Sequence, residues 1–322
     1  MFKLALAKVL LAAVSIAVTT GAAAQYPNKP IRIIVPYQAG GTSEVMARAV
    51  GDQLTAAWKQ PVVIENRPGG GTTIGAAIVA QAPADGYTIF VNASSFLINA
   101  HLMSKLPYDP QKDFMPLTLA ASNPHLLVVF PGLGIPTFKD FISVAKAKGK
   151  TMSYASFGNG SSGHLAFELF KKQYGFDMVH VPYKGVPQAL LDIMGGQVNA
   201  MLTDLLAAIP NVKSGKLSAL AVAADKRTPT LPEIPTFEEA SGTKFTSRSW
   251  FGLLVRSGTP PEIHRILSQE VAKALQKQEV KDRLLSLGMD TYGTSPEEFT
   301  AFMKSESERF ADAIKFSGTK IE

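Results

Sequence analysis

The chain has 322 residues, of which 46% are hydrophobic and 18% charged, and its mean hydropathy is +0.10. This length allows one large domain or two of ordinary size, and the composition excludes a disordered or fibrous protein. The chain contains no cysteine, which excludes disulfides, thiolate metal sites and cysteine nucleophiles. Its net charge of +6 comes from scattered basic residues, so nucleic acid is not an expected partner.

The first 24 residues have the pattern of a secretory signal peptide. Lys3 and Lys8 precede and enter an apolar stretch over residues 9–18, and an alanine run ends at Ala24. We expect cleavage between Ala24 and Gln25 and export to the periplasm. The alternative is an uncleaved membrane anchor, but the apolar run is too short to span a bilayer comfortably.

Short strand-like runs alternate with helical stretches in the first part of the mature chain. The expected elements, in chain order, are a strand at 31–35, a helix at 44–55, a strand at 61–64, a helix at 73–82 and a strand at 87–91. This β-α-β-α-β succession predicts an open parallel sheet with helices on both faces.

A second unit of the same kind follows the apolar run 126–130. It is expected to contain strands at 152–155, 178–181, 198–202 and 217–223, with helices at 165–174 and 188–195. Two similar α/β units in one chain indicate two lobes with a cleft between them. The tail from Pro260 onward is predicted to be helical, with a stop at Gly288.

A glycine-containing loop, residues 36–44, follows the first predicted strand. In sheets of this kind ligands bind beyond the carboxyl ends of the strands, where loops meet helix N-termini. Gly40 and Gly41 permit unusual backbone angles, and Thr42 or Ser43 can cap the helix behind them. A helix start of this type attracts anions. An ordinary glycine turn with a capping hydroxyl explains the same residues equally well.

A second loop, residues 154–164, lies between a strand and a helix. Its sequence matches the pattern G-x-G-x-x-G at Gly158, Gly160 and Gly163. A dinucleotide fold would also place an acidic residue at the end of the next strand, but that strand ends at Tyr183. We therefore expect no cofactor here and interpret the loop as a small-anion site with hydroxyls from Ser161 and Ser162.

Hydrolytic and metal chemistry have little support in the sequence. A nucleophile elbow requires G-x-S-x-G, a spacing that residues 160–163 lack. The five histidines are dispersed without an H-E-x-x-H pair, so we expect no metal. His164 is the only histidine beside a candidate loop, and we expect it to orient that loop rather than to act as a base.

Asp204 follows the predicted strand 198–203 and projects toward the same edge of the sheet as the glycine loops. An unpaired carboxylate at this position would repel an anion. We therefore expect Asp204 to bond a backbone donor, a lysine or an N–H group of the ligand.

Short motifs run in a fixed order through nearly the whole mature chain. They include Tyr26–Pro36, Glu65–Gly69, Asp85–Thr88, Leu106–Asp109, Val181–Gly185, Gly195–Val198, Leu231–Thr236 and Gly258–Pro261. In this order they resemble the Bug family, the periplasmic solute-binding proteins of tripartite tricarboxylate transporters. One position departs from the family, which usually carries Asp four residues after the first glycine of the Gly-Gly pair, where this chain has Glu44.

The resemblance implies an α/β, two-lobed, type II periplasmic-binding-protein fold, also called a Venus flytrap, with two crossover strands. We expect lobe 1 to comprise residues 25–124 and 228–322, and lobe 2 residues 125–227. The resemblance further implies a monomeric, non-catalytic protein that captures a carboxylated compound. A dicarboxylate, an aromatic carboxylate and an acidic amino acid all remain possible ligands. Delivery would be to a membrane transporter with one large and one small integral subunit.

In the family, one ligand carboxylate is held by two glycine-rich loops, largely through backbone N–H groups and hydroxyls. Transferred to this sequence, that arrangement names Ala39, Gly40, Gly41, Thr42, Ser43, Ser161 and Ser162, with Thr203 and Asp204 behind them. The predicted site is completed by Tyr37, Phe157, Gly160 and His164.

Two other functions use the same features. A ligand-loaded protein of this kind can dock to a sensory receptor instead of a permease. An exported serine hydrolase could use Ser161 or Ser162, although no triad partners are evident.

Overall fold

The computed structural model describes residues 26–320. The predicted signal peptide and its cleavage site lie outside these residues. Within them, no helix has both the length and the apolar character needed to cross a membrane.

The first lobe is built on three parallel strands. The strands are parallel, as the sequence predicts, and β1 (Ile31–Val35) lies between β2 (Val62–Asn66) and β3 (Thr88–Ala93). Helices cover both faces of these strands, so the side chains of β1 are almost all buried. On one face lie α2 (Thr42–Trp58), α10 (Pro261–Gln276) and α11 (Gln278–Leu285). On the other lie α3 (Thr73–Ala80), α4 (Ser94–Leu102) and α12 (Pro296–Ser317).

The second lobe repeats this arrangement. β5 (Ser153–Ser156) pairs in parallel with β6 (Val179–Pro182) and β7 (Ala200–Asp204). One face packs against α5 (Phe138–Lys148) and α6 (Ser162–Tyr174), whose phenylalanines fill an aromatic core. The other face packs against α7 (Val186–Met194) and α8 (Leu205–Lys213). Short 3₁₀ turns cover Gly70–Thr72, Pro131–Leu133 and Gly149–Thr151.

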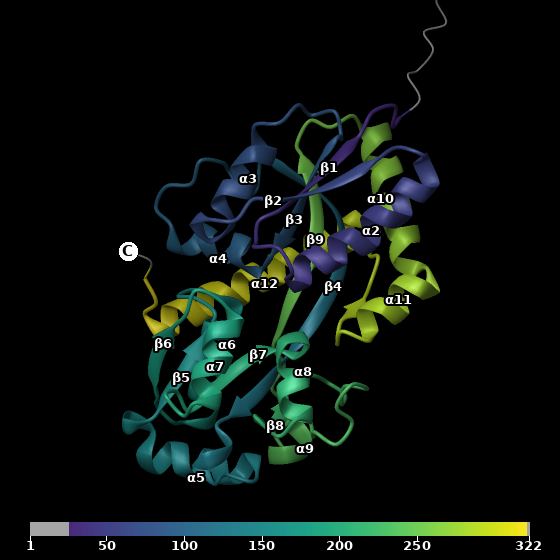
Figure 1. Ribbon diagram of the computed structural model, residues 1–322. Coiled ribbons are helices and arrows are strands. Elements are labelled where there is room, and N and C mark those ends of the chain that lie inside the picture. The colour runs from purple at the N-terminus through teal and green to yellow at the C-terminus, as the bar shows by residue number, and fades with distance from the viewer. Residues whose placement is uncertain (1–25, 321–322) are drawn as a thin grey trace, which may run out of the picture.

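Two long antiparallel strands carry the chain between these units. β4 (Phe114–Val129) pairs with β9 (Arg248–Arg256) as far as Pro124. From His125 onward it pairs instead with β7 and with β8 (Ser218–Val222). The chain therefore forms one mixed, curled sheet with two lobes, and β4 and β9 are the crossover strands (Figure 1).

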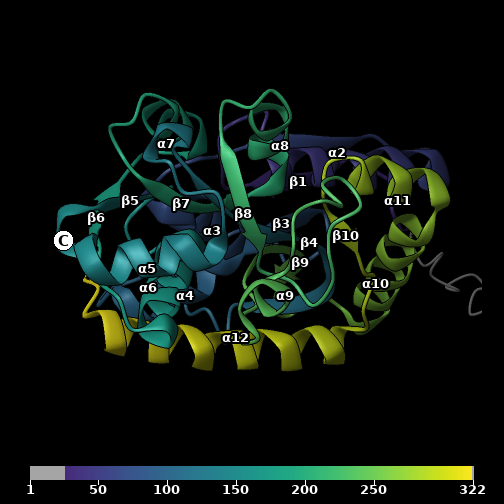
Figure 2. The same ribbon diagram turned by 90° about the horizontal axis from the view of Figure 1, so that it is seen from below.

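The last helix extends across both lobes. The short strand β10 (Asp290–Thr291) pairs with β4 and leads into α12, which runs along one side of the whole molecule in Figure 2. In the first lobe α12 packs on α4 and on Trp250 of β9. In the second it packs on α6, where Leu165 shares a core cluster with Phe310.

The packing of residues 237–245 bears on the boundary between the lobes. Phe237, in α9 (Phe237–Ser241), and Phe245 lie in the same core cluster as Phe138 and Phe170. This packing belongs to the second lobe, whereas the sequence assigned these residues to the first. We therefore propose that lobe 2 continues to about residue 247, where the chain enters β9.

Candidate ligand-binding site

Both glycine loops lie where the sequence predicts, at the carboxyl ends of β1 and β5 and before α2 and α6. Loop 1 comprises residues 36–41. Gly40 has a φ of 85°, a left-handed conformation that favours glycine. Gly41, by contrast, is extended, with φ −84° and ψ 169°. An added Cβ on Gly41 would meet only the Gln38 carbonyl oxygen, at 3.6 Å, which is an ordinary contact. The fold therefore does not require glycine at this position, but a side chain there would obstruct an approaching ligand.

The carboxylate of Glu44, a residue of α2, reaches back to loop 1. The expected cap from Thr42 or Ser43 is absent, because Gly41 is the N-cap of α2 and no side chain caps it. The Gly40 N–H instead donates to Glu44 Oε2 at 2.6 Å, and Arg48 Nε donates to Oε1 at 2.7 Å. These two contacts lower the pKa of Glu44, so it stays ionised near neutral pH. The Gly40 N–H, which we expected to face the ligand, is held by the chain's own carboxylate.

The start of α2 still has free donors. Among residues 26–320, the N–H groups of Thr42 and Ser43 donate to no other group. Glu44, the third residue of the helix, is at a position where a carboxylate complements the helix dipole. An anion approaching loop 1 would therefore meet the first two N–H groups of α2 rather than that of Gly40.

Loop 2, residues 157–161, is held by side chains of its own helix. Ser161 is the N-cap of α6, and its Oγ accepts from the His164 N–H at 3.3 Å. The Gly160 N–H donates to His164 Nδ1 at 3.1 Å. His164 therefore fixes the conformation of loop 2 through its ring. Gly163 must be small, because an added Cβ would lie 2.4 Å from the Phe157 ring.

His164 is part of a buried aromatic stack. Its ring lies parallel to that of His180, with 3.8 Å between centroids, and His180 Nε2 is 2.7 Å from Ser156 Oγ. Burial lowers the pKa of His164 to about 4, and the nearby Lys171 charge adds to this effect. Burial likewise lowers the pKa of His180 to about 3. Both rings are therefore neutral at pH 7, which leaves His164 Nδ1 available as an acceptor.

We expect the stability of the protein to fall as the pH drops from about 6.5 toward 4. In this window the unfolded chain binds protons at these histidines and the folded chain does not, so acidification favours unfolding. Each histidine contributes up to about 1.4 kcal/mol per pH unit. His164→Asn keeps an acceptor for Gly160 but does not titrate, so it should flatten the dependence. Urea unfolding between pH 7 and 4.5 measures this, and equal slopes for the two proteins would contradict it.

A buried polar cluster lies where β7, β4 and β9 meet. Asp204 ends β7, and its Oδ1 has no hydrogen-bond partner among residues 26–320. The nearest ring nitrogen, His125 Nε2, is 3.6 Å away. His125 contacts the hydroxyls of Ser247, at 2.9 Å, and Ser249, at 3.2 Å. Burial lowers the pKa of His125 to about 3, so its ring is neutral and does not balance the Asp204 charge.

Asp204 itself is strongly desolvated. Burial raises its pKa to about 6, and a contact with the Ser249 hydroxyl only partly opposes this rise. At pH 7 the carboxylate is mostly ionised, with one oxygen unpaired. An unpaired buried acceptor of this kind costs on the order of 1–3 kcal/mol, so the site favours a donor brought by something else.

This cluster contacts the start of α6 and lies near Tyr37 of loop 1. Ser249 Oγ is 3.3 Å from the hydroxyl of Ser162, the first residue of α6. From the first lobe, the Tyr37 hydroxyl is 3.4 Å from Ser95 Oγ. Burial raises the pKa of Tyr37 to about 12, and the negative charge of Asp204 adds to the rise. Tyr37 and Asp204 are thus within electrostatic range of each other across the two lobes.

The structure brings together only part of the predicted set. Tyr37, Phe157, Ser162, Thr203 and Asp204 surround or adjoin the polar cluster, and Ala39 and Gly40 lie on the exposed rim of loop 1. The sequence reasoning missed further buried polar residues at the same place: Asn123, His125 and Ser249. Unpaired atoms among these and their neighbours are Asn123 Nδ2 and Thr203 Oγ1. In β4 the polar residues Ser122, Asn123 and His125 lie between two apolar stretches, and this was a readable signal for Asn123 and His125.

Residues 46–318 match the family described as "Tripartite tricarboxylate transporter family receptor". The chain belongs to this family. Members of the TctC family, as it is also called, bind small carboxylates and work with membrane transporters. The protein is therefore a periplasmic solute-binding protein of the TctC/Bug type.

Individual relatives agree over almost the full length. Protein BugT of Bordetella pertussis is 32% identical over 299 residues, which is 92% of each chain. Among solved structures, Rpa4515 of Rhodopseudomonas palustris, with adipate, is 33% identical with a TM-score of 0.84, over 92% of this chain and 99% of that one. MatC of the same organism, with bound malate, is 30% identical with a TM-score of 0.79, over 90% and 100%.

Proposed function

We propose that this TctC-type protein captures a small carboxylated compound between its two lobes and delivers it to a membrane transporter with one large and one small integral subunit. The observation that supports capture is the meeting of two helix N-termini with a buried, incompletely bonded polar cluster. Loop 1 contributes Tyr37 and the free N–H groups at the start of α2. Next to loop 2, Ser162 at the start of α6 is linked through Ser249 to the cluster.

The helix N-termini and Asp204 have opposite electrostatic character, so they favour different groups of the ligand. A carboxylate is favoured at the starts of α2 and α6, where N–H groups and helix dipoles attract anions. The same carboxylate would be repelled by Asp204, which has no cationic partner among the described residues. The carboxylate therefore belongs on the loops, and Asp204 faces another group of the ligand.

That other group is a hydrogen-bond donor. Asp204 Oδ1 is buried and unpaired, so a hydroxyl or ammonium group of the ligand would satisfy it. Among the expected classes, this favours an acid that also carries a hydroxyl or amino group, such as a hydroxy acid or an acidic amino acid. We propose that the protein acts as a monomer, and that hinge closure buries this ligand between the lobes.

We expect Ser161→Ala to weaken binding about ten- to hundredfold, because it removes a hydroxyl donor to a charged acceptor. Gly41→Val should weaken binding further by blocking approach to the α2 N–H groups, while its extended backbone tolerates the new side chain. A thermal-shift panel of mono- and dicarboxylates would identify a ligand, and calorimetric titration would then measure each variant.

A matched control is Ser143→Ala on α5, an exposed serine that bonds only the carbonyl of Lys139. Ser161→Ala also removes a helix cap, so about 1 kcal/mol of stability is lost separately from affinity. If no carboxylate raises the melting temperature, the proposed function is wrong. If carboxylates bind but Ser161→Ala and Gly41→Val bind them like wild type, the ligand lies elsewhere.

A further inference from the structure

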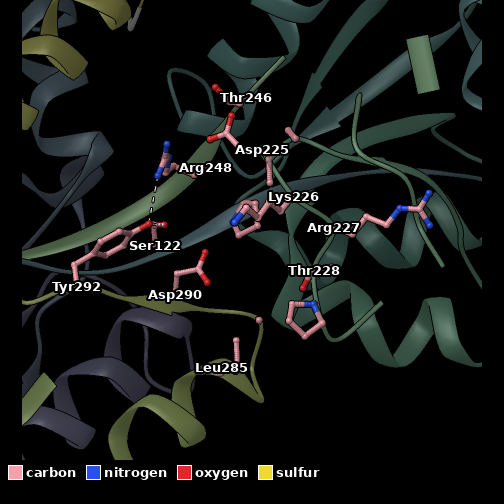
Figure 3. A pocket seen from close by; sticks show the side chains of 15 residues that line it. Ser122, Asp225, Lys226, Arg227, Thr228, Thr246, Arg248, Leu285, Asp290 and Tyr292 are labelled. Atoms are coloured by element: carbon pink, nitrogen blue, oxygen red, sulfur yellow. Dashed lines mark hydrogen bonds between the residues drawn. The ribbon is translucent and has the colours of Figure 1, made fainter. Parts of the chain in front are cut away.

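A groove of about 440 Å³ lies beside the crossover strands, away from the candidate site (Figure 3). Its floor is formed by Ser122 and Pro124 of β4, with Thr246 and Arg248 at the start of β9. None of these residues belongs to the site described above. We call this space the hinge groove.

Side-chain alternation places the hinge groove and the ligand site on opposite faces of the same two strands. Successive side chains of a strand point to opposite faces of the sheet. Along β4, Ser122 and Pro124 line the groove, whereas Asn123 and His125 belong to the polar cluster. On entering β9 the pattern repeats: Thr246 and Arg248 line the groove, and the two serines between and after them contact His125.

The two walls of the hinge groove come from different lobes. One wall is the segment 223–229, which follows β8 in lobe 2. The other is formed by Leu285, at the end of α11, and by Asp290 and Tyr292 near β10 in lobe 1. Figure 3 shows Asp225 and Asp290 on the two sides of the Arg248 side chain.

Arg248 attracts both walls. Its Nη1 donates to the Tyr292 hydroxyl at 3.3 Å, on the lobe 1 side. Burial raises the pKa of Asp290, and the charge of Arg248 opposes this rise. On the lobe 2 side, a contact with Lys244 lowers the pKa of Asp225, and Arg248 adds to that effect. An occupant that separates the walls therefore has to work against these attractions.

We propose that the hinge groove controls the lobe angle in the opposite sense to the ligand cleft. Rotation of the lobes about β4 and β9 that opens the cleft on one face narrows the groove on the other. A bulky group held in the groove therefore opposes cleft opening and favours the closed, ligand-holding state. This inference rests on the proposed function in one respect, that the ligand binds between the lobes.

The test is to place a bulky tryptophan side chain, here called a wedge, on one wall of the hinge groove or the other. Leu285 is 39% exposed, so Leu285→Trp adds volume to the groove without replacing a core residue. Lys226→Trp places the same wedge on the lobe 2 wall, where the wild-type side chain is exposed. Leu191→Trp on α7 is the matched control, since Leu191 is an exposed apolar residue outside the groove.

The angle between the lobes can be measured in the ligand-free protein. The chain has no cysteine, so Ile74→Cys and Val179→Cys introduce two unique labelling positions, both on exposed side chains. They lie on α3 and β6, in different lobes and away from α11 (Figure 1). Distances between spin labels at these positions report opening of the cleft.

We expect both wedges to shift the ligand-free distance distribution toward shorter values, and the control to leave it unchanged. For a carboxylate identified by the thermal-shift panel, or for malate as the first probe, the wedges should lower Kd about two- to tenfold, because the binding-competent fraction rises. Unchanged or longer distances in both wedge variants would overturn the inference. If distances shorten but no carboxylate binds, the groove controls the hinge and the proposed function fails instead.

Discussion

Malate and aspartate will bind ten- to hundredfold more tightly than succinate. The three compounds share two carboxylates on the same carbon chain and differ in one substituent, a hydroxyl, an ammonium or a hydrogen. A donor to a charged, buried acceptor contributes roughly 1.5–3 kcal/mol, and the analogue without it leaves Asp204 Oδ1 unpaired. If the site fits a longer carbon chain, the same order of affinities is expected in the series glutarate, 2-hydroxyglutarate and glutamate.

Asp204→Asn tests whether this carboxylate is responsible. The variant removes the negative charge, so the advantage of aspartate over succinate should shrink at least tenfold. Asp52→Asn, a change to an exposed side chain on α2, is the matched control. Since burial raises the pKa of Asp204 to about 6, acidification from pH 7.5 to 5 protonates it and should weaken the binding of aspartate, whose own carboxylates stay ionised over this range.

Calorimetric titration with each ligand distinguishes an error about the role of Asp204 from an error about the ligand class. Equal or tighter binding of succinate would show that Asp204 does not receive a ligand donor, while leaving carboxylate capture intact. Tighter succinate binding at low pH would mean that protonated Asp204 donates to a ligand carboxylate. Absence of binding by either series would reject the proposed ligand class as a whole.

The second large effect concerns stability: Trp250→Ala should lower the free energy of unfolding by about 3–5 kcal/mol. Trp250 is fully buried on β9 and packs edge-on against Phe299 and Phe302 of α12. Its Nε1 donates to Glu306 Oε2 at 2.9 Å. The substitution therefore opens a cavity and removes a hydrogen bond to a buried carboxylate.

Urea unfolding followed by circular dichroism measures this loss. The other tryptophan provides the comparison, because Trp58 is half-buried at the end of α2 and meets Tyr26 at a ring distance of 6.3 Å. Trp58→Ala should lower the free energy of unfolding clearly less than Trp250→Ala. Equal losses for the two variants would mean that the contact between β9 and α12 contributes little to the fold.

Local patterns were enough to predict the parallel units. Four of the five residues in the run 31–35 are apolar and β-branched, and the strand has those bounds in the structure. β4 was harder to predict from sequence, because Pro116 and Pro124 interrupt it and its register shifts twice against β9. Prolines and polar residues argue against a strand unless a distant partner pairs with it. That partner, β9, is more than a hundred residues further along the chain.

In the candidate site, too, local features were predictable from the sequence and contacts between distant residues were not. Its loops were predictable, because glycine and hydroxyl residues between a strand and a helix are a local signal. The contact of Glu44 with Gly40 was not, since it depends on a loop conformation that the sequence does not show. The cluster around Asp204 was only partly predictable, because it requires His125 and Ser249 to meet from two different strands.

The position of α12 limits the directions in which the lobes can move. Two strands alone would let two rigid bodies both swing and twist about their connection. α12 is fixed to the first lobe through Trp250 and reaches the second at Leu165, and the Lys320 carbonyl accepts from Asn159 of loop 2. A twist would slide α6 across this helix and break those contacts, so the swing is the low-energy motion. In the proposed function, the ligand would then leave the cleft through the face that α12 does not cover.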